Sequence, residues 1–251
     1  MHSLFTMVAL LPILTGLFVE DPWVNQLVMP KRGALEASNT DKNRGVVSLE
    51  KNDCWPSTVQ EEKGDLVKVK VRDGSGWIAK DKVVRMNDAI SYFTERITNK
   101  DDLADAYEKR AVIWYLQGKS ELAAEDAGEA IKINPCTRTY AKRGLAWIDR
   151  KEYDKAIKDY TEAIKLDPKY CVAYYNRAIA WQHKQNNDKA IEDFTDAIKL
   201  FPAYDEAFIG RGNIWNARKE YGKAIEDYSQ AIRIVPSNAQ AFYNRGLAWR
   251  K

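Results

Sequence analysis

Residues 137–170 read TRTYAKRGLAWIDRKEYDKAIKDYTEAIKLDPKY and define the unit from which most of this chain is built. Residues 171–204 read CVAYYNRAIAWQHKQNNDKAIEDFTDAIKLFPAY, and residues 205–238 read DEAFIGRGNIWNARKEYGKAIEDYSQAIRIVPSN. These segments align without a gap, and residues 104–136 form a more diverged copy that is one residue shorter. A period of about 34 residues is typical of a helical repeat array.

Each unit contains two amphipathic stretches. In residues 137–170, Tyr140, Gly144 and Trp147 share one face of a first helix, and Ala156 and Tyr160 share one face of a second. Of the chain's eight tryptophans, five recur with the period, so we expect each to fill the same slot between paired helices. These are Trp114, Trp147, Trp181, Trp215 and Trp249, the last of which has no second helix after it.

The pattern resembles the tetratricopeptide repeat (TPR) family over about residues 104–251. The resemblance is carried by alanine at the twentieth and twenty-seventh positions, a closing proline, and a small residue at the eighth position. The small residues are Ala111, Gly144, Ala178, Gly212 and Gly246. Ala127 stands where the family has a bulky aromatic residue at the twenty-fourth position, so we expect the first copy to pack less fully. The resemblance implies an all-α TPR solenoid.

The predicted array covers residues 88–251. It consists of a half repeat 88–103, repeats 104–136, 137–170, 171–204 and 205–238, and a half repeat 239–251. The helix at 239–251 lacks a following partner helix, which leaves an apolar face with Trp249 on it. Either the array is fragmentary at this point, or the face serves self-association or docking, because stacked repeats need a polar cap.

Two charged positions repeat in step. Arginine occupies the seventh position of the copies and aspartate the twenty-third, and the guanidinium fork suits a carboxylate. We expect a structural Arg–Asp ladder between paired helices, with a ligand-binding arginine stripe as the alternative. The arginines are Arg110, Arg143, Arg177, Arg211 and Arg245, and the aspartates are Asp126, Asp159, Asp193 and Asp227.

In the TPR family the ligand surface is the concave face of the first helices. The resemblance therefore implies a mixed apolar and polar groove that suits a protein or peptide segment. Its predicted residues are Lys109, Val112, Lys142, Leu145, Tyr175, Asn176, Ile179, Asn213, Tyr243 and Asn244.

The first third of the chain has a different character. Residues 1–19 contain an apolar run of the length of a signal-peptide core, so we expect a leader there. The alternative interpretation is that the run forms the first strand or a core helix of the next domain. Residues 64–84 alternate around Asp73-Gly74, which is typical of a β-hairpin. Residues 23–86 resemble a small all-β bacterial SH3-like barrel, in which Trp77 is either a core residue or a ligand platform.

Composition excludes several function classes. The 39 basic and 36 acidic residues leave a net charge of +3, which gives no indication of a nucleic-acid partner or of a membrane partner beyond the leader. The two histidines and three cysteines supply neither a zinc motif nor a disulfide framework. The sequence contains no nucleotide-binding fingerprint. We therefore expect a non-enzymatic protein without cofactor or metal.

The sequence predicts an adaptor that binds protein on the concave face of the array. The alternatives are a cell-wall-associated protein acting through the SH3-like domain and a regulatory or assembly subunit of a larger complex. Leader, barrel and array together resemble exported bacterial interaction proteins, which implies an extracytoplasmic location, with a cytoplasmic one as the alternative.

Overall fold

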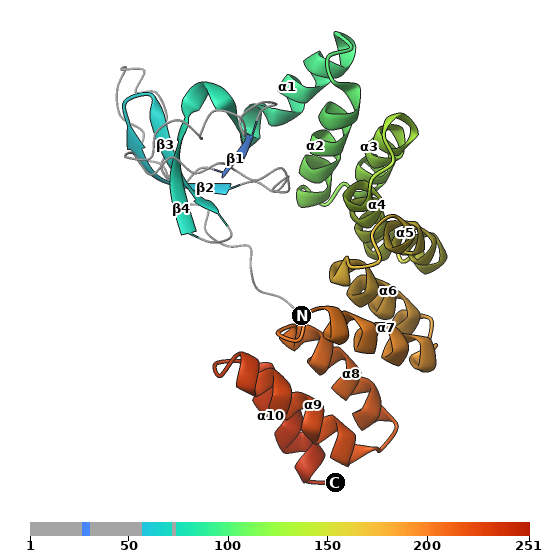
Figure 1. Ribbon diagram of the computed structural model, residues 1–251. Coiled ribbons are helices and arrows are strands. Elements are labelled where there is room, and N and C mark those ends of the chain that lie inside the picture. Colours follow the sequence, from blue (N-terminus) through green and yellow to red (C-terminus); the bar gives the residue numbers. More distant parts are fainter. Residues whose placement is uncertain (1–26, 31–56, 72–73) are drawn as a thin grey trace, which may run out of the picture.

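The computed structural model describes residues 27–30, 57–71 and 74–251. The predicted leader at 1–19 and most of the region 23–56 lie outside the described residues. Within the described residues, a small antiparallel sheet precedes a row of paired helices, as Figure 1 shows. None of the described helices is both long and apolar enough to cross a membrane.

The sheet contains the strands β1 (Leu27–Pro30), β2 (Ser57–Lys63), β3 (Leu66–Val71), β4 (Gly74–Ala79) and β5 (Val83–Arg85). Their order is β4-β3-β2-β1-β5, and all neighbours are antiparallel. The predicted hairpin forms from β3 and β4, with Val67 opposite Ile78. At the turn from β2 to β3, Gly64 has a φ of +56°, a left-handed conformation that suits glycine.

The predicted SH3-like barrel is not seen among the described strands. β4 and β5 form the two edges of the sheet and do not pair with each other within the described residues, so this sheet is open. One face is held by a cluster of β-branched residues from every strand, which suits a pleated, half-buried surface. The cluster contains Val28, Val59, Val67, Val69, Ile78 and Val83. Trp77 is partly buried, and the Lys68 ammonium lies 5.9 Å from its ring centroid.

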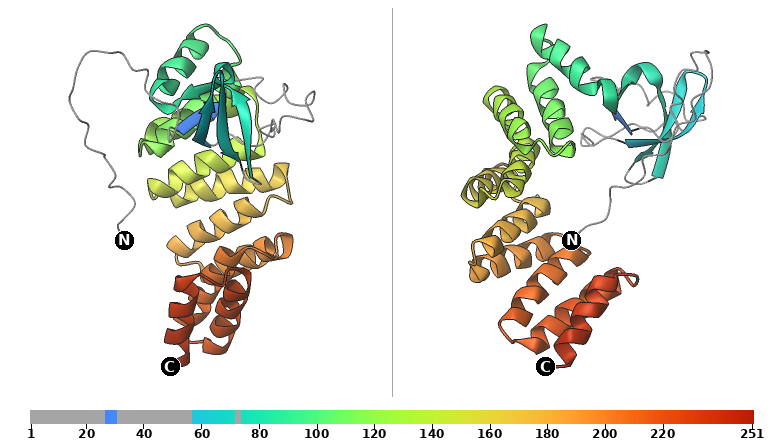
Figure 2. Two further views of the ribbon diagram at one scale, coloured as in Figure 1. Left: turned by 90° about the vertical axis from the view of Figure 1, so that its left-hand side faces the viewer. Right: turned by 180° about the vertical axis from the view of Figure 1, so that it is seen from behind.

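The helices follow β5 without a linker. They are α1 (Met86–Thr98), α2 (Leu103–Leu116), α3 (Ser120–Ile133), α4 (Thr137–Asp149), α5 (Tyr153–Leu166), α6 (Cys171–His183), α7 (Asn187–Leu200), α8 (Asp205–Ala217), α9 (Tyr221–Ile234) and α10 (Ala239–Trp249). The two views of Figure 2 and that of Figure 1 show an arc, with the sheet on its inner side beside α1 and α2. The first helices of the pairs, α2, α4, α6 and α8, line this inner side.

An aromatic ring on the second helix holds each of the later pairs together. Tyr160, Phe194 and Tyr228 are completely or almost completely buried. A Cβ atom on Gly144 would lie 2.7 Å from Cζ of Tyr160, so only glycine lets the α5 ring approach α4 so closely. The small residue at the eighth position and the aromatic residue at the twenty-fourth therefore belong to one packing unit.

The recurring tryptophans pack against the buried clusters of the array, as their spacing predicts, although their burial is incomplete. Trp114, Trp147, Trp181 and Trp215 are only partly buried. A lysine lies over each indole, at 4.3 to 4.6 Å from the ring centroid. It belongs to the second helix in the three later pairs, whereas Lys119 over Trp114 directly precedes α3. Such cation–π contacts keep one face of the ring covered while its edge stays accessible.

The sheet and the first helices share one hydrophobic core. Met29 of β1 and Val84 of β5 pack with Phe93 of α1 and with Val112 and Ile113 of α2. All five side chains are almost inaccessible to solvent. Buried contact across this junction fixes the sheet to the end of the array, because an apolar cluster of this kind is stabilised by its removal from water.

Candidate functional site

The Arg–Asp pairs lie between the two helices of each pair. Nε and Nη2 of Arg143 donate to the two carboxylate oxygens of Asp159 at 2.8 and 2.7 Å. The same two-bonded geometry joins Arg110 to Asp126, Arg177 to Asp193 and Arg211 to Asp227, at distances between 2.7 and 3.0 Å. The structure therefore brings together four arginines and four aspartates of the predicted set.

The arginines also reach back to the preceding pair. Nη1 of Arg177 donates to the Thr161 hydroxyl at 3.0 Å, and Nη1 of Arg211 donates to Thr195 at 2.9 Å. Arg110 and Arg245 make the same bond to Thr94 and Ser229. The guanidinium groups thus connect three successive helices. Arg143 differs, because the residue that faces its Nη1 atom is Gly128, which has no hydroxyl group to accept the corresponding hydrogen bond.

Burial and hydrogen bonding set the ionisation of this ladder. The hydrogen bond with Asp159 raises the pKa of Arg143 above its usual value. Burial raises the pKa of Asp193 and Asp227, and the hydrogen bonds from their arginines oppose this effect. The four bidentate guanidinium groups are already bonded within the fold, so the geometry matches a structural ladder better than a ligand-binding stripe.

On the inner face of α2 and α4, the predicted lysines pair with acidic residues of the chain. Lys109 is 6% exposed, and its ammonium lies 3.0 Å from a carboxylate oxygen of Asp105. Lys142 donates to Glu108 at 2.6 Å, and both side chains are largely buried. Val112 belongs to the core shared with the sheet. Lys109, which was predicted to contact a ligand, is therefore buried and paired within the fold, and Val112 is 2% exposed.

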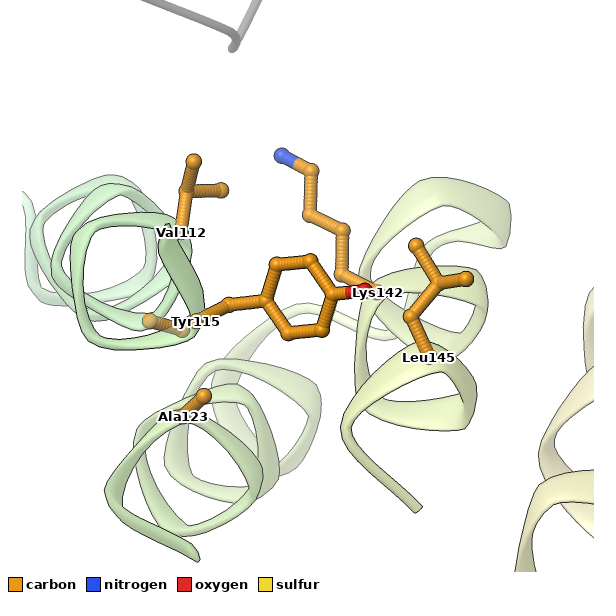
Figure 3. Close-up of a pocket in the computed structure, with 6 residues that line it drawn as sticks. Val112, Tyr115, Ala123, Lys142 and Leu145 are labelled. Carbon is orange, nitrogen blue, oxygen red and sulfur yellow. The ribbon is translucent and has the colours of Figure 1, made fainter. Parts of the chain in front are cut away.

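A pocket opens between α2, α3 and α4, and Figure 3 shows its lining. Val112 and Tyr115 come from α2, Ala123 from α3, and Lys142 and Leu145 from α4, with Ala111 completing the wall. The Tyr115 ring points from α2 toward α4, and the Lys142 chain runs past it. Burial raises the pKa of Tyr115 above its usual value. Apart from Lys142 and the Tyr115 hydroxyl, the walls are apolar.

The pocket lies in the pair that lacks the buried aromatic residue. Position twenty-four holds Tyr160, Phe194 and Tyr228 in the later pairs but Ala127 in α3. The walls include the small residues at positions eight and twenty, Ala111 and Ala123, against which a ring would otherwise pack. Tyr115 and Ala123 were not predicted from the sequence as binding residues, although the alanine at position 127 indicated that an aromatic ring is missing from this pair.

The inner face of α6 and the loop after α7 form an aromatic cluster. The ring of Tyr175 lies 4.8 Å from that of Tyr204 and 5.7 Å from that of Phe194, measured between centroids. Burial raises the pKa of Tyr175. Asn176 and Ile179 are half-buried on the same helix, and so is Leu145 on α4. These four side chains form a surface that stays partly accessible beside the Arg–Asp ladder; we call it the inner strip (Leu145, Tyr175, Asn176, Ile179).

Toward the end of the array, the predicted amides bond with each other. Asn213 accepts one hydrogen bond from the Tyr228 hydroxyl at 2.8 Å and another from Nδ2 of Asn244 at 3.0 Å. The carbonyl of Asn213 is thus used in the fold. Tyr243 is 68% exposed and lies on α10 beyond this network.

In the part of the chain that the structure describes, no group of three or more histidine, cysteine, aspartate or glutamate residues could hold a metal ion. His183 stacks on the Tyr153 ring at 4.7 Å between centroids, with the two planes 5° apart.

Three family profiles match the array. A profile described as tetratricopeptide repeat matches residues 137–170, a second with the same description matches residues 171–204, and one described as TPR repeat matches residues 212–249. The prediction of tetratricopeptide repeats is therefore confirmed, and the helical part of the chain is an all-α TPR solenoid. No curated protein matches the sequence.

Solved structures show the same fold. A crystal structure of MamA has a TM-score of 0.58 and is 20% identical, covering 62% of this chain and 91% of its own. YrrB, described as a TPR protein with an unusual peptide-binding site, has a TM-score of 0.57 at 16% identity. The match covers 64% of this chain and 84% of the YrrB chain. A TPR protein from Thermus thermophilus has a TM-score of 0.55 at 15% identity, covering 66% and 91%.

Proposed function

We propose that this protein is a non-enzymatic adaptor that binds a peptide or protein segment along the inner face of its helical array. The observation that carries the proposal is the inner strip, which offers partly accessible aliphatic, aromatic and amide groups on two adjacent first helices, α4 and α6. The pocket between α2, α3 and α4 continues this surface through Leu145. YrrB, which shares the fold, is described as having a peptide-binding site.

The charges near this surface indicate what kind of segment fits. Lys109 and Lys142 are held by Asp105 and Glu108, so neither offers an uncompensated cation to an acidic tail. Apolar side chains of the ligand would pack on Tyr175 and Ile179, and its backbone amides would bond with Asn176. Because the helices already hold this surface in place, binding orders few groups of the protein.

The proposal is tested by selecting ligands and then altering the strip. The full chain is used to select binders from a display library of random peptides, and their affinities are measured by isothermal titration calorimetry. Ile179→Lys should weaken the selected peptides by roughly tenfold, equivalent to about 1.4 kcal/mol. Leu166→Lys is the matched control, because Leu166 is 51% exposed at the end of α5. Peptides that bind both variants equally, or a selection that yields none, would overturn the proposal.

A further inference from the structure

Two tyrosine rings beside the inner strip are not covered by a cation. The rings of Tyr175 and Tyr204 are tilted by 31° to each other, with their centroids 4.8 Å apart. Elsewhere in the array a basic side chain covers many of the rings, as Lys155 does for Trp147 at 4.4 Å from the centroid. The ladder arginines likewise lie over the aromatic residues at position four. Within the described part of the chain, no lysine or arginine lies over Tyr175 or Tyr204.

The charges on the two first helices beside these rings are unbalanced. Arg177 of α6 and Arg211 of α8 are both bound by aspartates of the ladder. The remaining lysine, arginine, aspartate or glutamate residues of these two helices are Asp205 and Glu206, at the start of α8. Asp205 accepts a hydrogen bond from the Asn238 amide at 3.0 Å. Glu206 is exposed and forms no ion pair with any described lysine or arginine, so its negative charge is uncompensated.

The Glu206 carboxylate acts on both rings. Burial raises the pKa of Tyr175, and the charges of Glu206 and Asp205 raise it further. Burial also raises the pKa of Tyr204, and Tyr175 and Glu206 contribute to this effect. Partial burial raises the pKa of Glu206 itself, and the neighbouring Asp205 adds to the increase. A positive charge at this place would oppose each of these changes, because it stabilises ionised carboxylates and phenolates.

We propose that the segment bound along the inner face places a lysine or arginine side chain on these three residues, so that the partner is a basic peptide or protein segment. We call Tyr175, Tyr204 and Glu206 the cation site. The cation would lie over the two rings and pair with the carboxylate, while neighbouring apolar side chains of the segment pack on Leu145 and Ile179. An ammonium or guanidinium group attracts both the face of an aromatic ring and a carboxylate.

This inference rests on the proposed function, because it names the chemistry of the segment that the inner strip would bind. An acidic segment fits the same surface poorly, since its carboxylates would meet the like charge of Glu206. The lysines on the inner face of α2 and α4, Lys109 and Lys142, are paired with acidic residues of the chain and do not offset that repulsion.

The test uses peptides selected against the full chain from a display library of random sequences. We expect the selected sequences to share a lysine or arginine, and replacing that residue with methionine should weaken binding about tenfold in isothermal titration calorimetry. Glu206→Gln should cause a similar loss, with no further loss when it is combined with the methionine peptide. Glu192→Gln is the matched control, because Glu192 is an exposed glutamate on α7, a second helix.

Charge reversal separates direct pairing from a change of the fold. Glu206→Lys should weaken the basic peptides by about a hundredfold. Peptides with glutamate in place of their basic residue should then bind Glu206→Lys more tightly than they bind the wild type. A merely structural role of Glu206 would not produce this exchange, and its absence would overturn the proposal.

The aromatic part of the site is tested with two variants of Tyr175. Tyr175→Phe keeps an aromatic face and should retain affinity within about twofold, whereas Tyr175→Leu should weaken the basic peptides about fivefold. Equal affinity for both variants would overturn the placement of the cation over the rings. Thermal unfolding reports whether each variant keeps its fold, and if Tyr175→Leu does not, the exposed Glu206 variants decide the outcome.

The failure of this inference can be distinguished from the failure of the proposed function. A selection that yields no peptide, or peptides that bind Ile179→Lys as tightly as the wild type, would overturn both. Peptides that lose affinity for Ile179→Lys but share no basic residue would overturn this inference alone. The same holds for peptides that bind Glu206→Gln as tightly as the wild type.

Discussion

The α2–α3 pair and the α6–α7 pair follow one plan, and they differ in what fills the space between the helices. Phe194 of α7 is completely buried against α6 and against Gly210 of the next pair. Ala127 holds the same position in α3, and a pocket lined in part by Ala111 and Ala123 opens between this pair and α4. The comparison teaches that the Arg–Asp pair sets how two helices are aligned, while the aromatic residue decides how completely they pack.

The largest expected effect is the removal of the buried ring. Phe194→Ala should make the α6–α7 pair resemble the α2–α3 pair and lower the free energy of unfolding by about 3–5 kcal/mol. Urea unfolding followed by circular dichroism measures the loss. Phe201→Ala is the control, because Phe201 is 43% exposed and should cost little. A loss below about 1 kcal/mol for Phe194→Ala would contradict the assignment of the ring as the main packing element.

Alkaline pH should distinguish a tyrosine at this position from a phenylalanine. Burial raises the pKa of Tyr228 to about 12, whereas an unfolded tyrosine ionises near pH 10. The contribution of the neutral Tyr228 phenol to the free energy of unfolding is therefore complete below about pH 10. As the pH rises from about 10 through about 12, this free energy should fall by roughly 2–3 kcal/mol.

The measurement is the free energy of unfolding at several pH values between about 9 and 12, for the wild type and Tyr228→Phe. The variant should lose less stability over this range because it has no phenol to ionise. Tyr243→Phe serves as the control, since Tyr243 is 68% exposed. If the free energy of unfolding falls equally with pH in the wild type and in Tyr228→Phe, the Tyr228 ring is not buried in the way that the structure indicates.

Replacing the glycine at position eight with alanine should have opposite effects on stability in a helix that is covered by an aromatic ring and in one that is not. Gly144→Ala places a Cβ at 2.7 Å from the Tyr160 ring and should destabilise the protein by about 1–3 kcal/mol. Gly246→Ala meets no atom within 4 Å and should stabilise it by about 0.5–1 kcal/mol, because alanine favours a helix. Thermal unfolding of both variants tests the contrast, and destabilisation by Gly246→Ala would indicate that this face is covered.

The smallest effect concerns two tyrosine hydroxyls. Tyr228 donates to Asn213 at 2.8 Å. The buried Tyr160 hydroxyl finds no hydrogen-bond partner among the described residues, because its own repeat has Leu145 at the position of Asn213. Tyr228→Phe should cost about 0.5–1.5 kcal/mol, whereas Tyr160→Phe should be neutral or stabilising by up to about 1 kcal/mol. Urea unfolding compares them, and an equal loss in both variants would show that Tyr160 has a partner in solution.

Sequence periodicity was sufficient for the helices and for the ladder. The spacing located the pairs to within a few residues, and α1 begins at Met86 where the half repeat was expected at residue 88. The arginine and aspartate positions were predicted because both recur in every complete copy, and repeated geometry places repeated residues in the same contact. Ala127 was visible as a departure from the pattern, but the pocket beside it was not.

Other features could not be obtained from the pattern. Lys109 was predicted to face a ligand, yet it is buried, with its ammonium 6.0 Å from the ring centroid of Phe93 on α1 and 3.0 Å from a carboxylate oxygen of Asp105. The barrel was inferred from alternating residues in 64–84, but alternation fixes strands and not whether the sheet closes. The tryptophans were expected to fill a slot between helices, and they do pack against the buried clusters, but their spacing did not indicate that they stay partly exposed.

The sequence by itself determined the repeat, its two helices and the pairing of charges, because these depend on local periodicity that recurs in each copy. Only the tertiary structure decided which repeated positions remain accessible, as at the inner strip and at the pocket beside Leu145. The physical reason is that accessibility depends on what packs against a residue from elsewhere in the chain. A repeating sequence gives each copy the same residues but not the same neighbours.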